Sequence, residues 1–398
     1  MDKDTRDILK KIEDEELIPP LSATGMKLMD MASREDIPVG ELAKVIEKDP
    51  ALTLRLIRIA NSSFFGAASK VSTIYQAIVR LGFERVRLMA LSLSIRDAFP
   101  FGKRGNIDYG TFWRLSLYRG LIAKSISEYL SMGNPQEAFV AGLILEIGYI
   151  LFHRIFIKDE NSPYPHILEP LKEILRWQKK RYGVNHRELA QVALKRWNFP
   201  ESYIYCQAIY GKRAKEDDFP DFVKICESAR ILSIYLVHYG EDLLFEDIYI
   251  SIPIEMESEV LNRILINTFQ EVEGTAKELK IQVNREKDIM ELLEKANKTL
   301  LRISQKMTDM EDKLPTKKLP SLEYLYKSEV DPATIEAIAH EIRNPLLAVG
   351  GFARRLLSVM DPDSIGAQYA EVILKEAERL EEALKKIGAA SGITINNS

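Results

Sequence analysis

The sequence predicts an all-α protein with three folded parts: a large N-terminal helical domain, a helical coiled-coil linker, and a C-terminal antiparallel helical hairpin that forms a four-helix bundle on dimerisation. Three observations predict this fold class. Apolar residues recur at helical spacing through residues 1–265, a heptad pattern follows, and two further amphipathic helices come after it. Only residues 248–255 are strand-like.

The composition is that of an ordinary globular protein. Of the 398 residues, 46% are hydrophobic, and the formal net charge is only -4, so we expect buried cores and no broad electrostatic binding to nucleic acid. The charged N-terminus is unlike a signal peptide, and no uncharged apolar run reaches the roughly 18 residues of a membrane span. With only two cysteines, Cys206 and Cys226, the sequence predicts a reducing, cytoplasmic location.

Changes in composition divide the chain into four segments. Residues 1–265 form the helical domain, and residues 266–314, where aromatic residues become rare, form the coiled-coil linker. Prolines break the helical pattern in the irregular linker 315–330, and the hairpin occupies residues 331–390. The heptad seam of the coiled-coil linker comprises Ile289, Leu293, Ala296, Leu300, Ile303, Met307, Met310 and Leu314. An amphipathic helix docked on the preceding domain is the alternative interpretation of this seam.

Each helix of the hairpin carries one apolar stripe. The first helix spans about 332–360, residues 361–364 form the turn, and the second helix spans about 365–387. The stripes are Ile335, Ala339, Ile342, Leu346, Val349, Ala353, Leu356 and Met360, then Tyr369, Ile373, Ala377, Leu380, Leu384 and Ile387. Because one hairpin cannot bury both stripes alone, the sequence predicts a homodimer in which two hairpins pack as a four-helix bundle.

One histidine of the first hairpin helix stands out. His340 lies one residue past the apolar stripe, so its imidazole is expected on the outer face, with Glu341 beside it and Asn344 one turn on. An exposed imidazole beside a carboxylate is a competent nucleophile for phosphoryl groups, because the carboxylate can orient or take the proton of the second ring nitrogen. An ordinary surface histidine is the alternative.

The run His340-Glu341-Ile342-Arg343-Asn344-Pro345-Leu346 resembles the H-box of sensor histidine kinases, in the dimerisation and phosphoacceptor domain called HisKA. The resemblance covers about 331–388. It implies that His340 is the phosphorylated residue, that Glu341 assists proton transfer, and that Asn344 positions water when a response regulator is dephosphorylated. A metalloprotease-type zinc site is excluded, since Asn344 stands where a second histidine is required.

Sensor kinases follow this hairpin with an ATP-binding domain of roughly 150 residues, whereas this sequence ends at Ser398. No P-loop or other glycine-rich nucleotide loop occurs elsewhere. We therefore expect no cofactor in this chain, with ATP acting only through a kinase domain that is missing here or supplied in trans. The implied partners are a second copy in a homodimer, a response regulator receiver domain and a histidine-kinase ATP-binding domain in trans, with neither nucleic acid nor a membrane.

Several short stretches follow one another in a fixed order along residues 10–240. They are Leu17-Ile18-Pro19-Pro20-Leu21, Asp49-Pro50-Ala51-Leu52, Arg58-Ile59-Ala60-Asn61-Ser62, Ala77-Ile78, Leu81-Gly82, Ala141-Gly142-Leu143, Ile147-Gly148 and Trp197-Asn198-Phe199-Pro200. In this order they resemble the HDOD domain, a catalytically silent relative of the HD phosphohydrolases of bacterial signalling proteins. The resemblance implies an HD-like helical fold.

The metal ligands of an HD phosphohydrolase are replaced in this sequence. By the resemblance, Leu115 stands at the first histidine, Leu145-Glu146 at the His-Asp pair and Glu227 at the later aspartate. Leucine offers no lone pair to a cation, so we expect no metal site. A pair of histidines frequent near the end of such domains is replaced by Tyr210-Gly211.

The remaining histidines give no ligand pattern. His186 matches a histidine often seen in HDOD domains, while His153, His166 and His238 are isolated and are interpreted as structural or surface residues. The sequence therefore predicts a sensing or protein-docking domain. Its inactive cleft remains a candidate site for a nucleotide or another small ligand.

The leading functional hypothesis is a cytoplasmic two-component signal-transduction protein. In it, the HDOD-like domain receives a signal, the coiled-coil linker transmits it, and His340 accepts a phosphoryl group or relays it to a response regulator. A non-catalytic dimeric scaffold and a metal-dependent HD-type phosphohydrolase are the alternatives. As an enzyme, the chain resembles only part of a sensor histidine kinase.

Overall fold

The computed structural model of the 398-residue chain describes residues 3–14, 17–18, 21–32, 37–61, 70–99, 102–159, 162–211, 214, 219–238, 252–313, 346–347 and 349–390. These residues are mostly helical, as the sequence predicts. They belong to two compact units. The N-terminal unit comprises Met1–His238, Ile252–Ile254 and Thr268–Asn284, and the C-terminal unit comprises Tyr239–Ser251, Glu255–Asn267 and Arg285–Ser398.

The N-terminal unit is built from helices and one small antiparallel sheet. Its helices are α1 (Lys3–Asp14), α2 (Ala23–Ala32), α3 (Val39–Glu47), α4 (Pro50–Asn61), α5 (Ile74–Leu81), α6 (Phe83–Asp97), α7 (Tyr109–Tyr129), α8 (Pro135–Ile144), α9 (Ile147–Phe156), α10 (Leu171–Tyr182), α11 (His186–Arg196), α12 (Glu201–Ala208), α13 (Asp221–Val237) and the second part of α15 (Ser258–Leu279). The strands are β1 (Lys103–Arg104) and β2 (Ile107–Asp108). The strand-like segment expected at 248–255 is not a strand over its described residues, 252–255.

Side-chain caps determine where several of these helices begin. Thr73, Asp108 and Asn134 precede α5, α7 and α8, and each accepts hydrogen bonds from backbone amides of the first turn. Asn185 forms a capping box with Glu188 at the start of α11. The caps satisfy amides that have no partner inside the helix, so the local sequence sets these boundaries.

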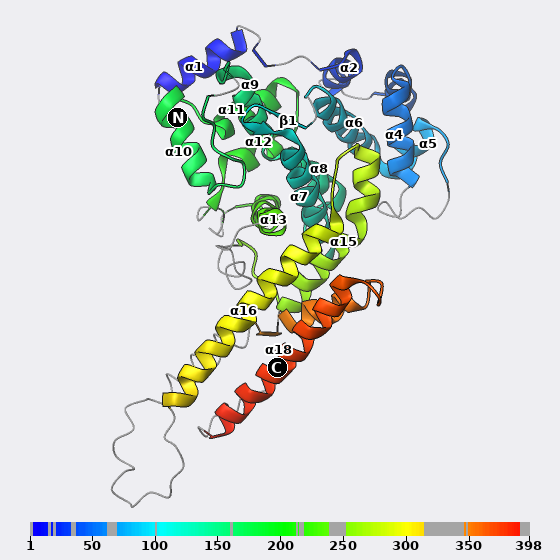
Figure 1. Ribbon diagram of the computed structural model, residues 1–398. Coiled ribbons are helices and arrows are strands. Elements are labelled where there is room, and N and C mark those ends of the chain that lie inside the picture. Colours follow the sequence, from blue (N-terminus) through cyan, green and yellow to red (C-terminus); the bar gives the residue numbers. More distant parts are fainter. Residues whose placement is uncertain are drawn as a thin grey trace, which may run out of the picture. The chain divides into compact units, whose positions relative to one another are not determined.

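Helix α7 forms the core of the N-terminal unit, where it packs against α8 and α13 (Figure 1). Its apolar side chains, such as Phe112 and Ile122, are completely buried. The contact between α7 and α8 is close because two glycines meet there. A Cβ on Gly142 would lie 2.6 Å from the carbonyl oxygen of Arg119 and 2.8 Å from the Cα of Gly120, so any side chain at position 142 would push the helices apart.

Among the described residues, the segment Pro135–Phe156 is the one stretch of helix long and apolar enough to cross a membrane by composition alone. This segment contains α8 and α9, and 83% of its most apolar window is buried in the structure. Burial in the core of the N-terminal unit accounts for its apolar composition.

Helix α15 ends at Leu279 because Lys280 adopts a left-handed backbone conformation, with φ of 54°. The amide of Ile281 then donates to the carbonyl oxygen of Ala276 at 2.9 Å, which closes the last turn as in a Schellman motif. Helix α16 (Arg285–Lys313) starts after a short connection. The predicted linker 266–314 therefore contributes to two separate helices.

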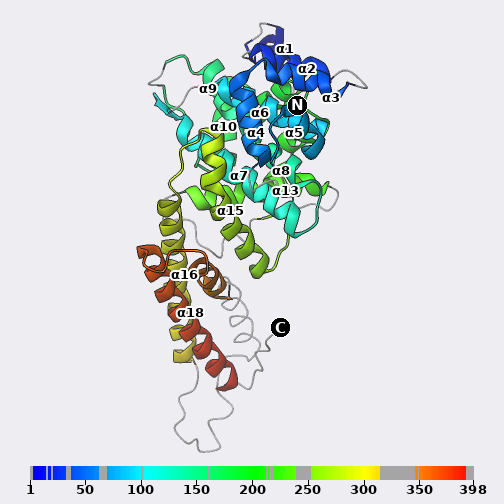
Figure 2. The same cartoon turned by 90° about the vertical axis from the view of Figure 1, so that its right-hand side faces the viewer.

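The C-terminal unit contains the first part of α15, helix α16, helical residues 346–347 and 349–357, and α18 (Ile365–Ala390). Helix α18 begins at the residue where the sequence predicts the second hairpin helix. Helices α16 and α18 lie side by side in both views (Figures 1 and 2). The described seam residues Ile289, Leu293, Ala296, Leu300 and Ile303 are at most 2% exposed.

One residue of the predicted α18 stripe is exposed in the single chain. Tyr369 is 52% exposed, whereas Ala370 and Ile373 are buried. Because successive residues are rotated by about 100° around a helix, Ala370 takes the inward position and Tyr369 faces outward with Ile365 and Val372. The described side chains do not include the predicted core residues Ile335, Ala339, Ile342, Met307, Met310, Leu314, Leu384 and Ile387. The dimeric four-helix bundle stays a prediction.

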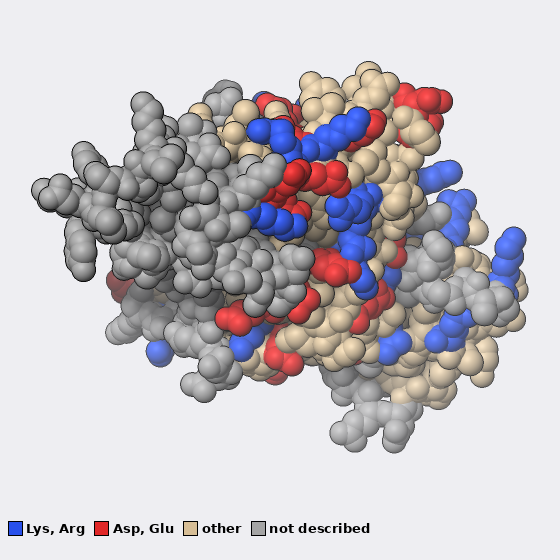
Figure 3. All heavy atoms as spheres, turned by 90° about the horizontal axis from the view of Figure 1, so that it is seen from below, with Lys and Arg blue, Asp and Glu red and all other residues tan. Residues whose placement is uncertain are grey.

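Opposite charges are interleaved on the surface. Helix α18 carries ion pairs between residues one turn apart, Glu371 with Lys375 at 2.9 Å and Glu381 with Lys385 at 2.8 Å. On the face shown in Figure 3, basic and acidic side chains alternate and are not gathered by sign. This distribution matches the small net charge of the chain.

Gly148 in α9 provides a test of the fold. A Cβ at this position would lie 1.9 Å from the backbone oxygen of His186 in α11. We expect Gly148→Ala to lower the free energy of unfolding by about 3 kcal/mol, because the new methyl group forces the backbone of α9 away from the backbone of α11. Gly274→Ala is the matched control: nothing lies within 4 Å of its Cβ position, so the change should stay within about 1 kcal/mol. Urea unfolding of the full chain measures both, and equal stability of Gly148→Ala and wild type would contradict the close contact.

Candidate functional site

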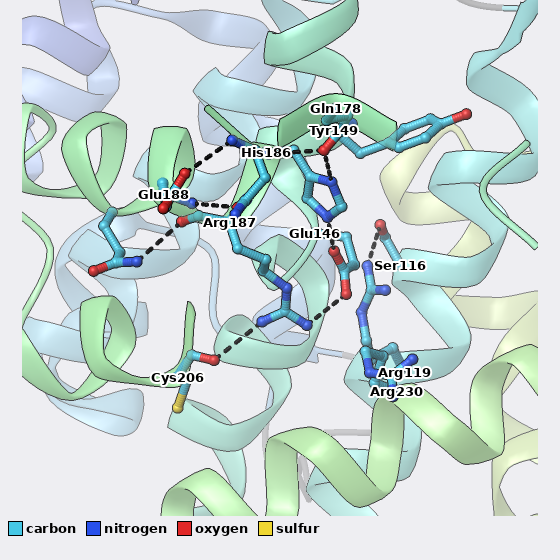
Figure 4. A network of polar contacts seen from close by, with 12 residues as sticks. Ser116, Arg119, Glu146, Tyr149, Gln178, His186, Arg187, Glu188, Cys206 and Arg230 are labelled. Atoms are coloured by element: carbon cyan, nitrogen blue, oxygen red, sulfur yellow. Dashed lines mark hydrogen bonds and ion pairs between the residues drawn. The ribbon is translucent and has the colours of Figure 1, made fainter. Parts of the chain in front are cut away.

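Helices α7, α10, α11 and α13 and the turn between α8 and α9 line a small cavity, called here the Glu146 cavity, whose polar side chains are drawn in Figure 4. Its lining includes Leu115 and Arg119 of α7, Glu146 between α8 and α9, His186 of α11 and Arg230 of α13. The cavity volume is about 10 Å³, which is room for one water molecule. Two positions singled out in the sequence, Leu115 and Glu146, thus come together.

The carboxylate of Glu146 lies at the centre of the polar network and is almost completely buried. Arg187 donates from Nη2 to Oε1 at 2.6 Å, and Nε2 of His186 lies 2.9 Å from Oε2. Burial alone would raise the pKa of Glu146, but the charge of Arg187 and the contact with His186 outweigh burial and hold this pKa far below its usual range. Both carboxylate oxygens of Glu146 therefore lie within hydrogen-bond distance of a side-chain nitrogen atom, one from Arg187 and one from His186.

The hydrogen bonds of His186 define its protonation. The backbone amide of His186 donates to Oε1 of Gln178 at 2.9 Å, which identifies this atom of the amide group as the oxygen. The same oxygen lies 2.7 Å from Nδ1, so Nδ1 must also donate. Because Nε2 faces the acceptor Glu146, the Nε2–Oε2 contact needs a proton of its own. Burial lowers the pKa of His186, and the hydrogen bond and charge of Glu146 oppose this effect.

The guanidinium of Arg187 is held on three sides. Besides Glu146, its Nη1 donates to the carbonyl oxygen of Cys206 at 3.1 Å. Its Cζ lies 5.5 Å from the ring centre of Tyr210, within the range of a cation–π contact. Tyr210 thus has a structural role at the position where the sequence analysis noted a lost histidine.

A second buried ion pair lies on α13. Arg230 makes two hydrogen bonds to Glu227, from Nε at 2.7 Å and from Nη2 at 2.6 Å. The amide of Gly211 donates to the same carboxylate at 2.8 Å. Glu227 is therefore bound by neighbours on two segments, and its partner Arg230 lines the Glu146 cavity.

Arg119 is completely buried and bonds to neutral acceptors. Its Nε donates to the carbonyl oxygen of Gly142 at 2.7 Å, and its Nη2 donates to Oγ of Ser116 at 2.9 Å. Burial lowers the pKa of Arg119 to about 10, and the charge of Glu146 opposes this effect. Arg119 thus stays protonated and adds a third positive charge near the two carboxylates.

This set of side chains does not fit a metal ion. Leu115 has no lone pair, both oxygens of Glu146 are taken by Arg187 and His186, and the nearby guanidinium groups repel a cation. Among the residues that the structure describes, no group of three or more His, Cys, Asp or Glu side chains could hold a metal. Guanidinium groups instead supply the positive charge that balances the buried carboxylates.

The arginines are the residues that sequence reasoning missed. Arg119 lies one helical turn after Leu115, and Arg187 directly follows His186, so both are adjacent in sequence to positions that the sequence analysis singled out. Leu145 was singled out in the sequence but does not line the Glu146 cavity. It is the buried C-cap residue of α8.

The other histidines lie apart from this network. His153 packs edge-on to Tyr164 in the core, His166 is exposed before α10, and His238 follows the last turn of α13. The predicted phosphoacceptor residues His340, Glu341 and Asn344 lie outside the described residues.

Comparison with protein-family models assigns both parts of the chain. The HDOD domain model matches residues 18–211, and the His Kinase A (phospho-acceptor) domain model, HisKA, matches residues 334–388. The chain combines an HDOD domain with a HisKA domain. Both resemblances drawn from the motifs are thereby confirmed. The HDOD match contains Glu146 and His186, and the HisKA match contains His340.

Solved structures match the HDOD part in fold. A candidate phosphohydrolase from Shewanella amazonensis SB2B is 20% identical with a TM-score of 0.52, over 68% of this chain and 96% of that chain. An HDOD domain protein with unknown function from Geobacter sulfurreducens is 21% identical with a TM-score of 0.49, over 71% of this chain and 100% of that chain. At these identities the likeness concerns the fold alone.

Two curated relatives share part of the sequence. An uncharacterized protein of Treponema pallidum is 21% identical over 209 residues, which are 50% of this chain and 37% of that protein. The uncharacterized protein YuxH of Bacillus subtilis is 24% identical over 129 residues, which are 32% of this chain and 31% of that protein. The chain therefore spans well under two thirds of the length of either relative.

The buried pair of Glu146 and Arg187 leads to a stability prediction. At pH 7, Glu146→Gln should lower the free energy of unfolding by about 3 kcal/mol, because it leaves the buried Arg187 without its counter-charge. Since the native pKa of Glu146 is held below the ordinary value of 4.5, its contribution is present above that pH and is lost as the pH falls below it. The difference between variant and wild type should therefore shrink at pH 4.

Urea unfolding of the full chain at both pH values measures these differences. Glu173→Gln is the control, since Glu173 pairs with Arg176 on the exposed surface of α10 and its loss should cost at most about 1 kcal/mol. Equal effects of the two variants at pH 7 would show that the Glu146 pair does not stabilise the domain.

Proposed function

We propose that this protein works in two-component signalling and that His340 is its phosphoacceptor. The HDOD and HisKA matches identify a signal-transduction protein of the histidine-kinase type. The observation that carries the finer proposal is the run from His340 to Leu346, which lies inside the HisKA match and has the residues of an H-box. Phosphotransfer in a cytoplasmic setting is the activity we assign to it.

The chemistry needs few groups in this chain. A ring nitrogen of His340 attacks the γ-phosphorus of ATP held by a histidine-kinase ATP-binding domain, a nitrogen–phosphorus bond forms, and ADP leaves. Glu341 holds or takes the proton of the other ring nitrogen, which makes the attacking nitrogen more nucleophilic. In the relay step, the nitrogen–phosphorus bond breaks as the carboxylate of a receiver-domain aspartate binds the phosphoryl group. Asn344 positions water for later hydrolysis of that aspartyl phosphate.

The HDOD domain contributes input and not catalysis in this proposal. The Glu146 cavity has a volume of about 10 Å³, whereas pockets for small molecules measure about 300–1,000 Å³. A nucleotide therefore does not fit this cavity, which removes the main reason to expect a ligand there. We assign the domain a docking role, in which a partner protein binds its surface and changes the C-terminal unit through α15, which contributes to both units.

The metal-dependent phosphohydrolase is disfavoured by the donor set around Glu146, as described above. A dimeric scaffold without chemistry would have the same fold. The scaffold and the phosphoacceptor differ in one measurable property, which is whether His340 acquires a phosphoryl group.

The test is phosphorylation of the full chain in trans. Incubated with a histidine-kinase ATP-binding domain and labelled ATP, wild type should acquire an acid-labile phosphoryl group, and His340→Gln should lose at least about 90% of the label because it lacks the attacking nitrogen. His166→Gln, a change at an exposed histidine of the HDOD domain, should label like wild type. Mass spectrometry of the peptide around residue 340 locates the group. Unchanged labelling of His340→Gln would exclude this residue as the acceptor.

A further inference from the structure

The heptad seam of α16 is buried inside one copy of the chain. Leu293 and Ala296 are completely buried, and Ile289 and Leu300 are at most 2% exposed. Helix α16 packs along α18 within the C-terminal unit (Figures 1 and 2). The sequence pattern alone assigned this seam to a second copy of the same helix, since a heptad repeat is the pattern of a coiled coil.

The apolar stripes of the hairpin are buried in the same copy. Of the described members, Tyr369 is 52% exposed and Met360 is half-buried, whereas the others are at most 3% exposed: Leu346, Val349, Ala353, Leu356, Ile373, Ala377 and Leu380. The first part of α15 also contacts the first hairpin helix, through an ion pair between Glu259 and Arg355 at 2.6 Å. Close by, a Cβ on Gly351 would lie 2.8 Å from Nδ2 of Asn262. Helical segments of one chain thus cover most of the described stripe residues that two copies were expected to cover.

We propose that α16 is an autoinhibitory helix that competes with dimerisation of the HisKA hairpin. In the closed chain, α16 covers the hairpin stripes, and its release exposes these stripes to a second copy. The two arrangements exclude each other, because one apolar face of the hairpin cannot contact both α16 and the hairpin of another copy. The inference rests on the hairpin dimer of the proposed function.

The buried side of α16 is suited to reversible release. It includes polar and charged residues, since Asp288 and Thr299 are completely buried and Lys295 is 4% exposed. Burial lowers the pKa of Lys295 to about 8. Each of these groups has a partner within the chain, and taking them out of water still offsets part of the free energy that the apolar residues of α16 gain on burial.

A pair of adjacent leucines separates this inference from a coiled coil. Leu300 is 1% exposed in the seam, whereas Leu301 is 58% exposed. If α16 covers the hairpin, Leu293→Ala with Leu300→Ala weakens the closed chain and strengthens the dimer. If the seam instead forms a dimeric coiled coil, the same change weakens the dimer. The two arrangements therefore predict changes of opposite sign in the dimer dissociation constant of the double variant.

Analytical ultracentrifugation of the full chain over a range of concentrations measures the dimer dissociation constant. We expect it to fall at least about tenfold for the double variant, and to stay within about twofold of wild type for Leu301→Ala. An increased or unchanged dissociation constant for the double variant would overturn the inference. Circular dichroism confirms that the helical content and the unfolding of the HDOD domain are retained.

Crosslinking tests the closed packing without changing the seam. Met290 of α16 and Tyr369 of α18 line one groove of about 470 Å³, and the native Cys206 and Cys226 are buried, so introduced cysteines react selectively. We expect Met290→Cys with Tyr369→Cys, treated with a short bis-maleimide, to give a crosslinked chain of monomer mass that no longer dimerises. Each single cysteine variant is the control. Crosslinked species of dimer mass only would overturn the inference.

The outcomes also separate this inference from the proposed function. Crosslinking of dimer mass refutes the closed chain and leaves the hairpin dimer in place. A chain that remains monomeric in every variant refutes the competition and the dimer together, while labelling of His340 in trans still reports on phosphotransfer. Absence of labelling in the double variant, in which α16 no longer covers the hairpin, refutes the proposed phosphoacceptor alone.

Discussion

The buried contact of Glu146 with Arg187 and His186 is the constraint around which the N-terminal unit is organised. It joins the junction between α8 and α9 to the start of α11. A buried carboxylate without a counter-charge would lower the stability of the fold by several kcal/mol. The helices must approach closely for these bonds to form, which is why Gly148 lies directly against the backbone of His186. The polar network and the helix packing therefore depend on each other.

The same network explains how an HD-like fold is stable with side chains that cannot hold a metal. In a metal site, a cation balances the buried carboxylates. Here guanidinium groups on α7, α11 and α13 balance Glu146 and Glu227 and leave room for about one water molecule. The side chains of this network are part of the buried core. Helix α15 contributes residues to both units.

The C-terminal unit shows what a heptad pattern specifies. The pattern identified Ile289, Leu293 and Leu300 as buried, and they are buried. It favoured a coiled coil, with a docked amphipathic helix as the alternative, and within one chain α18 packs against α16. Burial of an apolar stripe is favourable against any apolar surface of matching shape, so periodicity predicts that a face is covered but not by what. In the single chain, Ala370 and not Tyr369 is buried at the first turns of α18.

The sequence by itself determined the all-helical class, the starts of helices with side-chain caps, and the HDOD and HisKA domains, because these depend on local periodicity, on capping chemistry and on short motifs. It also identified Leu115 and Glu146 as replaced ligand positions. Only the tertiary structure decided that Arg119, Arg187 and Arg230 converge near them, since the three lie far apart along the chain. The left-handed backbone conformation of Lys280, which separates α15 from α16, was also not predicted from the sequence. Long-range charge balance and the choice of packing partner arise from contacts between distant segments, and a one-dimensional pattern does not contain them.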